Sequence, residues 1–391
     1  MKLFSFFSGS GFLDLGFEHN GFDVAFVNEF NPEFLRAYRY ARVHMANPIN
    51  RPACGYYQGD INDFINDENL RRNMAQDMQY YRAQGEWVGF CGGPPCPDFS
   101  VAGKQKGRDG DNGKLSQSYI DMIVNMHPDF FLFENVKGLW QTKRHREFYE
   151  ELKVQLHNAG YKTTERLTNA LEFGAPQDRD RILLFGVSDN LLPANCYDGD
   201  EITNFNWDAY KQYDLDEVKN NYPWPDTDPF VANGQTQPPQ GIPVNLTVEH
   251  WFRQNNVDNH PNAGDFFVPR AGLARMQTIE EGDVSRKCYK RVHRWRYSPT
   301  AAYGNNEVHL HPYRARRMSA ADTLAIQTLP ADFSLPGDMS LTNKFKTIGN
   351  GVPYVLACGI AQTIRDYLNQ NVNQNVVGNQ NGQIVDLSNI E

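Results

Sequence analysis

The sequence predicts an α/β protein with a doubly wound, mostly parallel sheet and a second, smaller and irregular domain. Strand-like and helix-like patterns alternate from residue 1 to about residue 187, which is typical of parallel strands joined by covering helices. A glycine-rich loop follows the first of these strands, and carboxylates follow others. Because open α/β sheets bind ligands at such strand ends, we expect one site there.

Short apolar runs bounded by polar or turn residues predict the strands, and apolar residues at helical spacing predict the helices. The expected strands are residues 3–7, 23–28, 56–58, 87–90, 130–133 and 181–187. The expected helices are residues 13–19, 32–44, 116–126 and 146–159. Together they predict a catalytic and cofactor-binding domain over residues 1–187.

The chain changes character beyond this domain. Residues 191–265 contain eight prolines and little periodicity, and such a stretch is too long for a simple loop. We therefore expect an inserted irregular domain over residues 188–317. Helical patterns then return, so residues 318–370 are expected to complete the first domain, and the Asn/Gln-rich residues 371–391 are expected to be frayed.

Composition and cysteine spacing exclude several classes of protein. No apolar run approaches the roughly 20 residues that span a membrane, and the chain starts with a strand-like run rather than a signal peptide. The six cysteines are scattered without a Cys-x-x-Cys pair, which argues against a zinc site or a disulfide framework and for a reducing cytoplasm. We expect neither a metal nor a membrane partner.

Charge distribution points to nucleic acid although the net charge is −9. Residues 285–317 carry nine lysines and arginines, one acid and several aromatic residues. Such a stretch can follow a phosphate backbone; the alternative is a solvated face. The residues expected to contact DNA there are Lys290, Arg291, Arg294 and Arg296.

The loop after the first strand reads Phe7-Ser8-Gly9-Ser10-Gly11-Phe12-Leu13 and opens a helix. Its glycines let the backbone approach a ligand at a helix N-terminus. Glu29 ends the next strand, where an acid binds ribose hydroxyls, and Asp60 follows the third, where a carboxylate can accept an adenine amino group. These features predict a pocket for an adenosine-containing cofactor; the alternative for either acid alone is a helix cap.

Cys96 lies in the segment Gly92-Gly93-Pro94-Pro95-Cys96-Pro97, directly after an apolar strand. The prolines fix φ, remove backbone donors and favour extended conformations before them. They predict a rigid loop that presents the Cys96 thiol beyond the sheet edge, whereas Cys91, inside the strand, is expected to be structural. The alternative is a proline-rich turn with an incidental cysteine.

Glu134 ends a strongly apolar strand, where an acid without a partner or a task is unusual. Further on, Gln177, Arg179 and Arg181 precede an apolar strand, and alternation places them on one face. Two arginines on one face indicate an anionic or carbonyl partner. The alternative is a surface ladder of ion pairs with the neighbouring aspartates.

In this order, the motifs resemble those of the DNA (cytosine-5)-methyltransferase family, and the resemblance covers nearly the whole chain. The matches are the glycine loop, Glu29, Asp60, the Pro-Pro-Cys loop, Glu134-Asn135-Val136, Gln177-x-Arg179-x-Arg181, residues 317–330 and Ile348-Gly349-Asn350-Gly351-Val352-Pro353. The resemblance implies a Rossmann-like catalytic domain, S-adenosylmethionine as methyl donor, S-adenosylhomocysteine as product, and a target-recognition domain for duplex DNA.

The resemblance also implies roles for individual residues. Cofactor contacts are expected from Phe7, Gly9, Ser10, Gly11, Leu13, Asn28, Glu29, Asp60, Ile61, Pro94, Asn350 and Val352. Besides the basic stretch, DNA contacts are expected from Ser100, Lys104, Lys106 and Gln177.

The implied reaction takes place on a cytosine flipped out of the duplex, because a stacked base does not expose carbon 6. The Cys96 thiolate adds to carbon 6, which enables carbon 5 to take a methyl group. Arg179 or Arg181 would help to lower the pKa of Cys96. Glu134 would hydrogen-bond ring nitrogen 3, and Arg181 would hold the exocyclic oxygen. Residues 100–113 are expected to close over the DNA.

Five positions depart from the family pattern. Pro97 replaces a usual Gln, Phe12 replaces a usual Gly, and Ala102 stands where some relatives have a serine that enters the vacated base stack. The usual Gly-Asn-Ala-Val-Pro-Pro reads Gly-Asn-Gly-Val-Pro-Tyr, ending at Tyr354.

Three alternatives stay open. The tRNA-methylating branch of the family is usually compact before its C-terminal motifs, so the long interval 188–298 favours DNA. Intact Cys96, Glu134 and Arg181 argue against a DNA-binding module with a dead site, and an oxidoreductase does not explain the Pro-Pro-Cys loop. The single-module chain further suggests a monomeric prokaryotic or phage modification enzyme, with a restriction endonuclease that acts on the same site without a stable complex. The recognition sequence is not readable.

Overall fold

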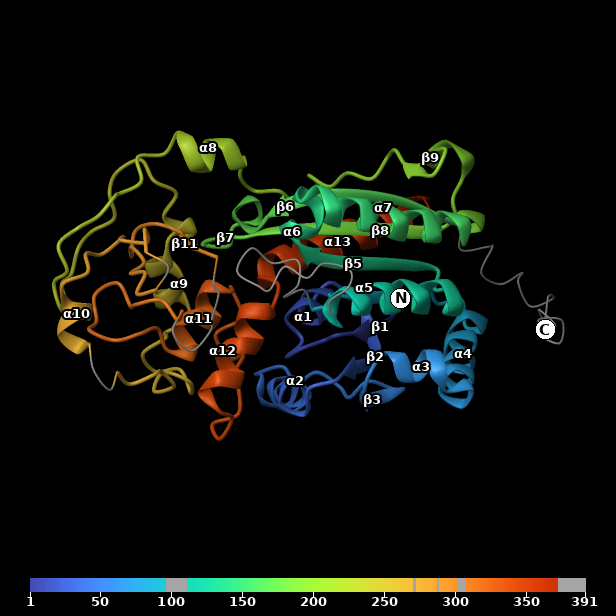
Figure 1. Ribbon diagram of the computed structural model, residues 1–391, viewed down its shortest axis with the longest axis horizontal. Helices are drawn as coiled ribbons and strands as arrows, with labels where there is room; N and C mark the ends of the chain where they lie inside the picture. The colour runs from blue at the N-terminus through green and yellow to red at the C-terminus, as the bar shows by residue number, and fades with distance from the viewer. Residues whose placement is uncertain (96–110, 270–271, 287, 301–306, 372–391) are drawn as a thin grey trace.

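The computed structural model describes residues 1–95, 111–269, 272–286, 288–300 and 307–371. Figure 1 shows a larger lobe, with the sheet and its helices, and a smaller lobe of short helices and long connections on the left. Several residues of interest lie outside the described residues: Cys96, Pro97, Ser100, Ala102, Lys104, Lys106 and positions 372–391 of the tail.

Within the described residues, a sheet of nine strands forms the larger lobe, in the order β3-β2-β1-β4-β5-β8-β6-β10-β9. The strands are β1 Lys2–Phe6, β2 Asp23–Glu29, β3 Gly55–Gln58, β4 Val88–Gly92, β5 Phe130–Val136, β6 Tyr161–Asn169, β8 Asp180–Ser188, β9 Tyr197–Asp198 and β10 Glu201–Ile202. All six expected strands are present, and their ends lie within three residues of the prediction.

Strand direction is mixed. Strands β3, β2, β1, β4 and β5 are parallel, but β8 is antiparallel to both β5 and β6. A parallel neighbour needs a crossover of a dozen or more residues, usually a helix. Between β6 and β8 the chain has only the 3-10 helix Ala170–Phe173, the strand β7 Gln177–Asp178 and short loops, so it turns back. The predicted doubly wound, mostly parallel sheet is confirmed, with β8 and the edge strand β9 as antiparallel exceptions.

Helices cover both faces of this sheet, because successive side chains of a strand point to opposite faces. Leu3 of β1 belongs to the core beneath α1, α2 and α13, whereas Phe4 and Phe6 belong to the core beneath α3, α4, α5 and α7. The first set is α1 Phe12–Glu18, α2 Pro32–His44 and α13 Tyr354–Asn371, and the second is α3 Asn62–Asn66, α4 Glu68–Ala83, α5 Asp111–Met126 and α7 Lys143–Asn158, with the short α6 Lys137–Gln141 after β5.

Helix α2 begins directly after β2, and its cap sets the geometry of that corner. The Asn31 side chain accepts hydrogen bonds from the backbone N–H groups of Glu33 and Phe34, at 2.9 and 3.3 Å. Pro32 occupies the first turn, where its missing N–H is not needed. The chain therefore turns sharply from Glu29 into the helix and fixes this acid at the strand end.

The smaller lobe begins later than the sequence predicts. Strands β9 and β10 extend the main sheet, and Ile202, Phe205 and Trp207 pack into its core. The expected boundary at residue 188 therefore shifts to about residue 208. The elements of the smaller lobe are α8 Leu215–Asn220, the 3-10 helix Val244–Leu246, α9 Val248–Gln254, α10 Leu273–Gln277 and β11 Ser298–Pro299, which pairs with β7.

The chain returns to the larger lobe through α11 Ala320–Ile326 and α12 Leu341–Asn350, which lie between the two lobes in Figure 1. Their apolar side chains share one core with Phe12 and Leu15 of α1 and with Val248 and Val292 of the smaller lobe. This shared core holds the two lobes against each other.

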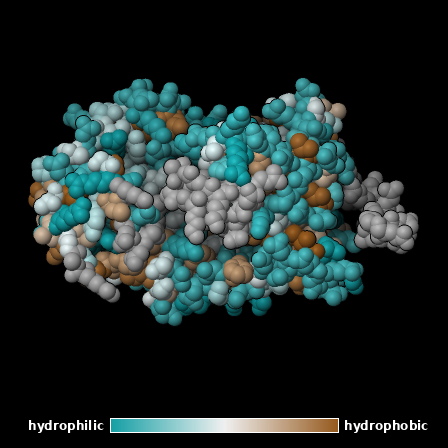
Figure 2. Space-filling model, viewed as in Figure 1, coloured by the Kyte–Doolittle hydropathy of each residue, from teal (hydrophilic) through white to brown (hydrophobic). Residues whose placement is uncertain are grey.

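On the face shown in Figure 2, the coloured surface is mostly hydrophilic, and hydrophobic residues form scattered spots rather than one broad patch among the described residues. In the part of the chain that the structure describes, no helix combines the length and the apolar character needed to cross a membrane.

Candidate active site

The glycine loop at the carboxyl end of β1 folds as a series of left-handed turns. Phe7, Gly9 and Gly11 have φ values of 53°, 57° and 78°, a region that bulky residues such as Phe7 rarely adopt. At Gly11 a Cβ atom would lie 2.4 Å from the Tyr38 ring, so both conformation and space require glycine. The half-buried Leu13 follows in the first turn of α1. The loop thus places its backbone tightly over the helix start.

Glu29 holds this loop. Its two carboxylate oxygens accept hydrogen bonds from the backbone N–H groups of Gly9, at 2.8 Å, and Asn31, at 2.7 Å. Its side chain is buried, and desolvation raises the pKa of Glu29 although the backbone N–H groups oppose the change. Each oxygen has a second lone pair, so the same carboxylate can also accept a ligand hydroxyl.

Asp60 and Asn28 shape the neighbouring strand end. Asp60 Oδ1 accepts from the backbone N–H and the side chain of Asn62, at 2.9 and 2.8 Å, just before α3, whose N-cap position is Ile61 rather than Asp60. The Asn28 amide donates to the carbonyls of Tyr57 and Gly59, at 3.3 and 2.9 Å. Asp60 is half-exposed, whereas the expected contact Ile61 is buried.

Phe30 was not identified by sequence reasoning. It directly follows Glu29, and its ring is 70% exposed. An exposed aromatic ring of this size is unusual beside a buried acid at a strand end. The sequence feature that could have identified Phe30 is its position, one residue after an acid expected to bind ribose.

Helix α12 and the turn after it contact the glycine loop. The hydroxyls of Ser10 and Thr347, on α12, are 2.7 Å apart. Asn350, the last residue of α12, is exposed and Val352 is buried beyond it. The structure therefore brings Ser10 and the turn at residues 349–352, which are 340 positions away in sequence, to the same strand edge.

Glu134 and Arg181 form a buried ion pair on the adjacent strands β5 and β8. Arg181 Nε lies 2.6 Å from Glu134 Oε1, and the two side chains are 8% and 7% exposed. Glu134 Oε1 has no hydrogen-bond partner in the described structure, so the contact is electrostatic rather than a well-directed hydrogen bond. This oxygen keeps its capacity to accept or share a proton with a ligand.

The segment that leads to Cys96 passes directly over this pair. At Gly93 a Cβ atom would lie 2.6 Å from Glu134 Oε2, so a larger residue would collide with the carboxylate. Asn135 donates to the Pro94 carbonyl at 3.5 Å. Cys96 itself is outside the described residues.

Arg179 and Gln177 differ from their expected roles. Arg179 is buried and its Nη2 donates to the carbonyls of Gly349 and Asn350, at 2.7 and 3.4 Å. Gln177 is fully buried and its Nε2 donates to the side-chain Oε1 of Gln327 at 3.4 Å. The structure therefore does not support direct catalysis by Arg179 or DNA contact by Gln177, because both side chains are engaged in the interior.

The ion-pair ladder considered as their alternative is also absent among the described side chains. Asp180 pairs with Lys137 at 2.6 Å, and Asp178 pairs with Lys219 at 2.9 Å. Arg181 donates to the backbone carbonyl of Asp180 rather than to its carboxylate. The two aspartates thus bind lysines from other elements.

Two expected phosphate contacts in the basic stretch require correction. Arg291 is fully buried and donates to the backbone carbonyls of Ile279 and Met276, and burial lowers the pKa of Arg291 to about 10. Arg294 is buried and paired with Glu281 at 2.7 Å. Both guanidinium groups hold the smaller lobe together and do not reach the surface. Only half-exposed positions remain from the original set, Lys290 and Arg296.

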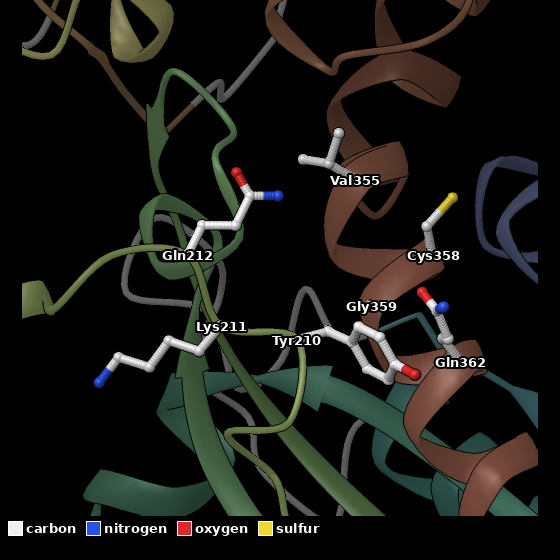
Figure 3. Close-up of a pocket in the computed structure, with 7 residues that line it drawn as sticks. All are labelled: Tyr210, Lys211, Gln212, Val355, Cys358, Gly359 and Gln362. Carbon is white, nitrogen blue, oxygen red and sulfur yellow. The ribbon is translucent and has the colours of Figure 1, made fainter.

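Two other cysteines, Cys91 and Cys358, lie in surroundings that do not favour a nucleophilic thiolate. Cys91 is fully buried, and desolvation raises the pKa of its thiol well above the usual value. Cys358 lines a surface cavity of about 350 Å³ between α13 and residues 210–212, shown in Figure 3. Burial also raises the pKa of Cys358. The cavity contains neither Glu134 nor the glycine loop.

The fold and this site define a doubly wound α/β enzyme, with its charged and glycine-rich segments gathered at the carboxyl ends of β1, β2, β4 and β5. The model of the C-5 cytosine-specific DNA methylase family matches residues 1–366. The chain belongs to this family. It transfers a methyl group from S-adenosylmethionine to carbon 5 of cytosine in DNA.

Individual relatives support the same assignment. The chain is 54% identical over 366 residues to the Type II methyltransferase M.NmeDI of Neisseria meningitidis serogroup C, covering 94% of this chain and 84% of the relative. It is 28% identical over 381 residues to the Type II methyltransferase M.FnuDI of Fusobacterium nucleatum, covering 94% and 95%.

Solved structures share the fold at low identity. A prophage-encoded E. coli protein, described as a DNA modification methyltransferase, matches with a TM-score of 0.60 and 19% identity over 95% of this chain and all of its own. A variant of Spodoptera frugiperda DNMT2 matches with a TM-score of 0.56 and 16% identity, covering 93% and 99%.

Proposed function

We propose that this chain is the modification methyltransferase of a Type II restriction–modification system and that it methylates one cytosine of a specific duplex sequence. The support is the 54% identity to a relative named a Type II methyltransferase, over 84% of that protein. We further propose that it acts as a monomer, and that a separate endonuclease recognises the same sequence without a stable complex.

The proposed S-adenosylmethionine pocket lies between the glycine loop, β2 and the turn after α12. Its residues fit this ligand. The loop backbone is open to close approach at the half-exposed Gly9, where a Cβ atom would meet only Thr347 Oγ1, 3.8 Å away. Glu29 offers lone pairs for ribose hydroxyls, and Asp60 offers a carboxylate for the adenine amino group. We add Phe30, whose exposed ring can stack on adenine. When bound, the ligand supplies an activated methyl group.

In the proposed mechanism Cys96 adds to carbon 6 of the flipped cytosine, forming a carbon–sulfur bond and an electron-rich carbon 5. The Glu134 carboxyl group interacts with ring nitrogen 3, where charge develops, and Arg181 holds Glu134 in place at 2.6 Å. After carbon 5 has taken the methyl group it loses its proton, and the Cys96 thiolate departs as the double bond between carbons 5 and 6 re-forms.

The observation that carries this proposal is the Gly93–Pro95 segment, which passes within contact distance of the Glu134–Arg181 pair just before Cys96. The test is covalent capture on duplex DNA that contains 5-fluorocytosine, whose carbon 5 cannot lose a proton. We expect a stable adduct in the presence of S-adenosylmethionine, and no adduct or methyl transfer by Cys96→Ser.

The matched control is Cys54→Ser, at a half-buried cysteine beside Tyr81. It should behave as the wild type. Methyl transfer by Cys96→Ser at near wild-type rate would overturn the assignment of the nucleophile, and bisulfite sequencing of DNA from expressing cells would identify the modified site.

On the DNA side, we propose that the smaller lobe reads the sequence and that Lys290 and Arg296 contribute phosphate contacts. Both are half-exposed, and Arg296 is held by the Pro225 carbonyl at 3.3 Å. Ser100, Lys104 and Lys106 stay proposed contacts of the segment after Cys96.

A further inference from the structure

Phe12 is the residue at which the glycine loop becomes helix α1, and its ring is enclosed. The side chain is 2% exposed. Its ring packs edge-to-face on Phe333, with centroids 5.3 Å apart and planes at 89°. Because close-packed interiors resist displacement, the ring has a fixed position relative to the loop.

Gly351 also lies against this ring. Its backbone has φ −62° and ψ 151°, a conformation that any residue adopts, so the glycine is not required for backbone freedom. A Cβ atom at Gly351 would lie 2.2 Å from Cδ2, 2.8 Å from Cε2 and 2.9 Å from Cγ of Phe12. The glycine is therefore required by the volume of the Phe12 ring.

The turn that contains Gly351 is held rigidly from its other side. Gln327 donates to the carbonyl of Ile348 at 2.6 Å and to that of Gly351 at 3.3 Å. Arg179 donates to the Gly349 and Asn350 carbonyls. These bonds leave the turn no room to retreat from Phe12 without breaking buried hydrogen bonds.

We propose that Phe12 and Gly351 form a matched steric pair that sets the spacing between the glycine loop and the turn at residues 349–352. These are two backbone walls of the S-adenosylmethionine pocket, so the pair positions the cofactor; this inference rests on the proposed function for the location of that pocket. Phe12 and Gly351 are thus positioning residues rather than catalytic ones.

The test is a double-mutant cycle with Gly351→Ala, Phe12→Ala and the double variant. Overpacking by one methyl group costs about 1–3 kcal/mol, which corresponds to roughly 5- to 150-fold. We expect Gly351→Ala to weaken S-adenosylhomocysteine binding, measured by calorimetry, by about tenfold or more. It should raise the KM for S-adenosylmethionine more than it lowers kcat. The double variant should bind at least about threefold more tightly than Gly351→Ala alone.

Gly337→Ala is the matched control, because nothing lies within 4 Å of a Cβ atom at that position. It should bind S-adenosylhomocysteine as the wild type does. If Gly351→Ala does not fold, recovery of a folded, binding-competent protein in the double variant supports the pair, and failure of that recovery overturns it. Equal affinity of Gly351→Ala and Gly337→Ala would also overturn it.

The two proposals fail in different ways. Two results would contradict the location of the pocket. One is a wild-type protein that does not bind S-adenosylhomocysteine, and the other is a Glu29→Ala variant that binds it with wild-type affinity. A wild type that binds and depends on Glu29, combined with a neutral Gly351→Ala, would contradict only the steric pair.

Discussion

Arg179 and Arg181 lie two residues apart, yet their guanidinium groups contact different parts of the molecule. Arg181 faces Glu134 at 2.6 Å, at the end of the central strands. Arg179 reaches the last carbonyls of α12. Strand alternation predicts that both lie on one face of the strand, but it cannot tell that both are buried or which partner each will meet. One arginine pairs with the carboxylate that we propose acts on the substrate, and the other holds the turn after α12.

Variants at Arg181 and Glu134 should separate the effect of the ion pair on the free energy of unfolding from its effect on methyl transfer. Arg181→Ala leaves the Glu134 carboxylate buried without its cation, which typically costs about 3–5 kcal/mol. We expect a loss of that order in the free energy of unfolding, measured by urea denaturation, together with loss of methyl transfer. Glu134→Gln combined with Arg181→Ala should recover much of the stability and none of the activity. Arg72→Ala, which breaks an exposed ion pair with Glu68, is the control; a fully stable Arg181→Ala would contradict the ion pair's role.

Phe30→Ala should affect ligand binding alone. Its ring is 70% exposed, so its removal should change the free energy of unfolding little. Stacking of an aromatic ring on a base is worth about 1–3 kcal/mol, which predicts a rise of roughly 5- to 150-fold in the dissociation constant for S-adenosylhomocysteine. Tyr80→Ala, at another exposed ring (64%), should leave binding unchanged in the same calorimetric titration. Wild-type affinity of Phe30→Ala would remove the ring from the pocket.

At the scale of elements, the basic stretch shows how charge in sequence differs from charge at the surface. Burial of Arg291 and Arg294 leaves Lys290 and Arg296 as half-exposed members of the predicted set. The described part of the smaller lobe has few regular elements. Arginine side chains there donate hydrogen bonds to backbone carbonyls that would otherwise pair with neighbouring strands. A basic run in an irregular domain can therefore be internal scaffolding.

Mutation of a half-exposed basic residue should affect DNA binding, whereas mutation of a buried one should affect stability. Lys290→Ala should flatten the salt dependence of DNA binding by about one unit of slope, since one phosphate contact is lost. Arg294→Ala should leave that slope unchanged and lower the free energy of unfolding by about 3–5 kcal/mol, because Glu281 stays buried without its partner. Fluorescence anisotropy over a salt series and urea denaturation check both halves. A flattened slope in Arg294→Ala would return this residue to the DNA interface.

The central strands and the flanking helices could be predicted from sequence because their apolar residues recur at the strand or helix period. Strand β6 could not, because Tyr161–Asn169 has mostly polar residues and becomes a strand through pairing with β8 over its whole length. Helices α4 and α12 were missed for a related reason: in α4 only Met74, Met78 and Tyr81 are buried. Pairing and docking with distant elements decided these segments.

The prediction of site residues likewise succeeded where a local sequence pattern marks them and failed where distant segments pack together. Glu29, Glu134 and the glycine loop follow directly from strand-end position, and the structure places all three at one edge of the sheet. The contacts of Thr347 and Gly351 with the glycine loop could not be predicted. These contacts depend on how a segment more than 300 residues away packs against the loop. The local sequence pattern carries no information about that packing.

At the scale of the whole molecule, burial of histidines in the smaller lobe should make the protein sensitive to acid. Desolvation lowers the pKa of His309 to about 3 and that of His311 well below its usual value. The unfolded chain takes up protons below about pH 6.5 while the folded chain does not, so stability falls as the pH drops from 6.5 toward 3. His309 alone should contribute a loss of about 1.4 kcal/mol at pH 5.5.

Urea denaturation at pH 7.5 and pH 5.5 measures this loss. His309→Gln carries no titrating group, so the difference between the two pH values should shrink by about 1.4 kcal/mol relative to the wild type. His44→Gln, at an exposed position, is the control. Equal pH dependence of His309→Gln and the wild type would show that His309 is not held in its neutral form.

The docking of α1 against α13 has a consequence during protein synthesis. Gly16 lies so close to Ala357 that a Cβ atom there would be 2.5 Å from the Ala357 side chain, and the His19 imidazole meets the Tyr354 hydroxyl across 335 residues of sequence. At about 5–20 residues per second, a ribosome needs roughly 20–70 s to make the interval. Throughout that time the apolar flank of α1 is not covered by α13. We therefore expect a chain that ends before α13 to leave this flank exposed.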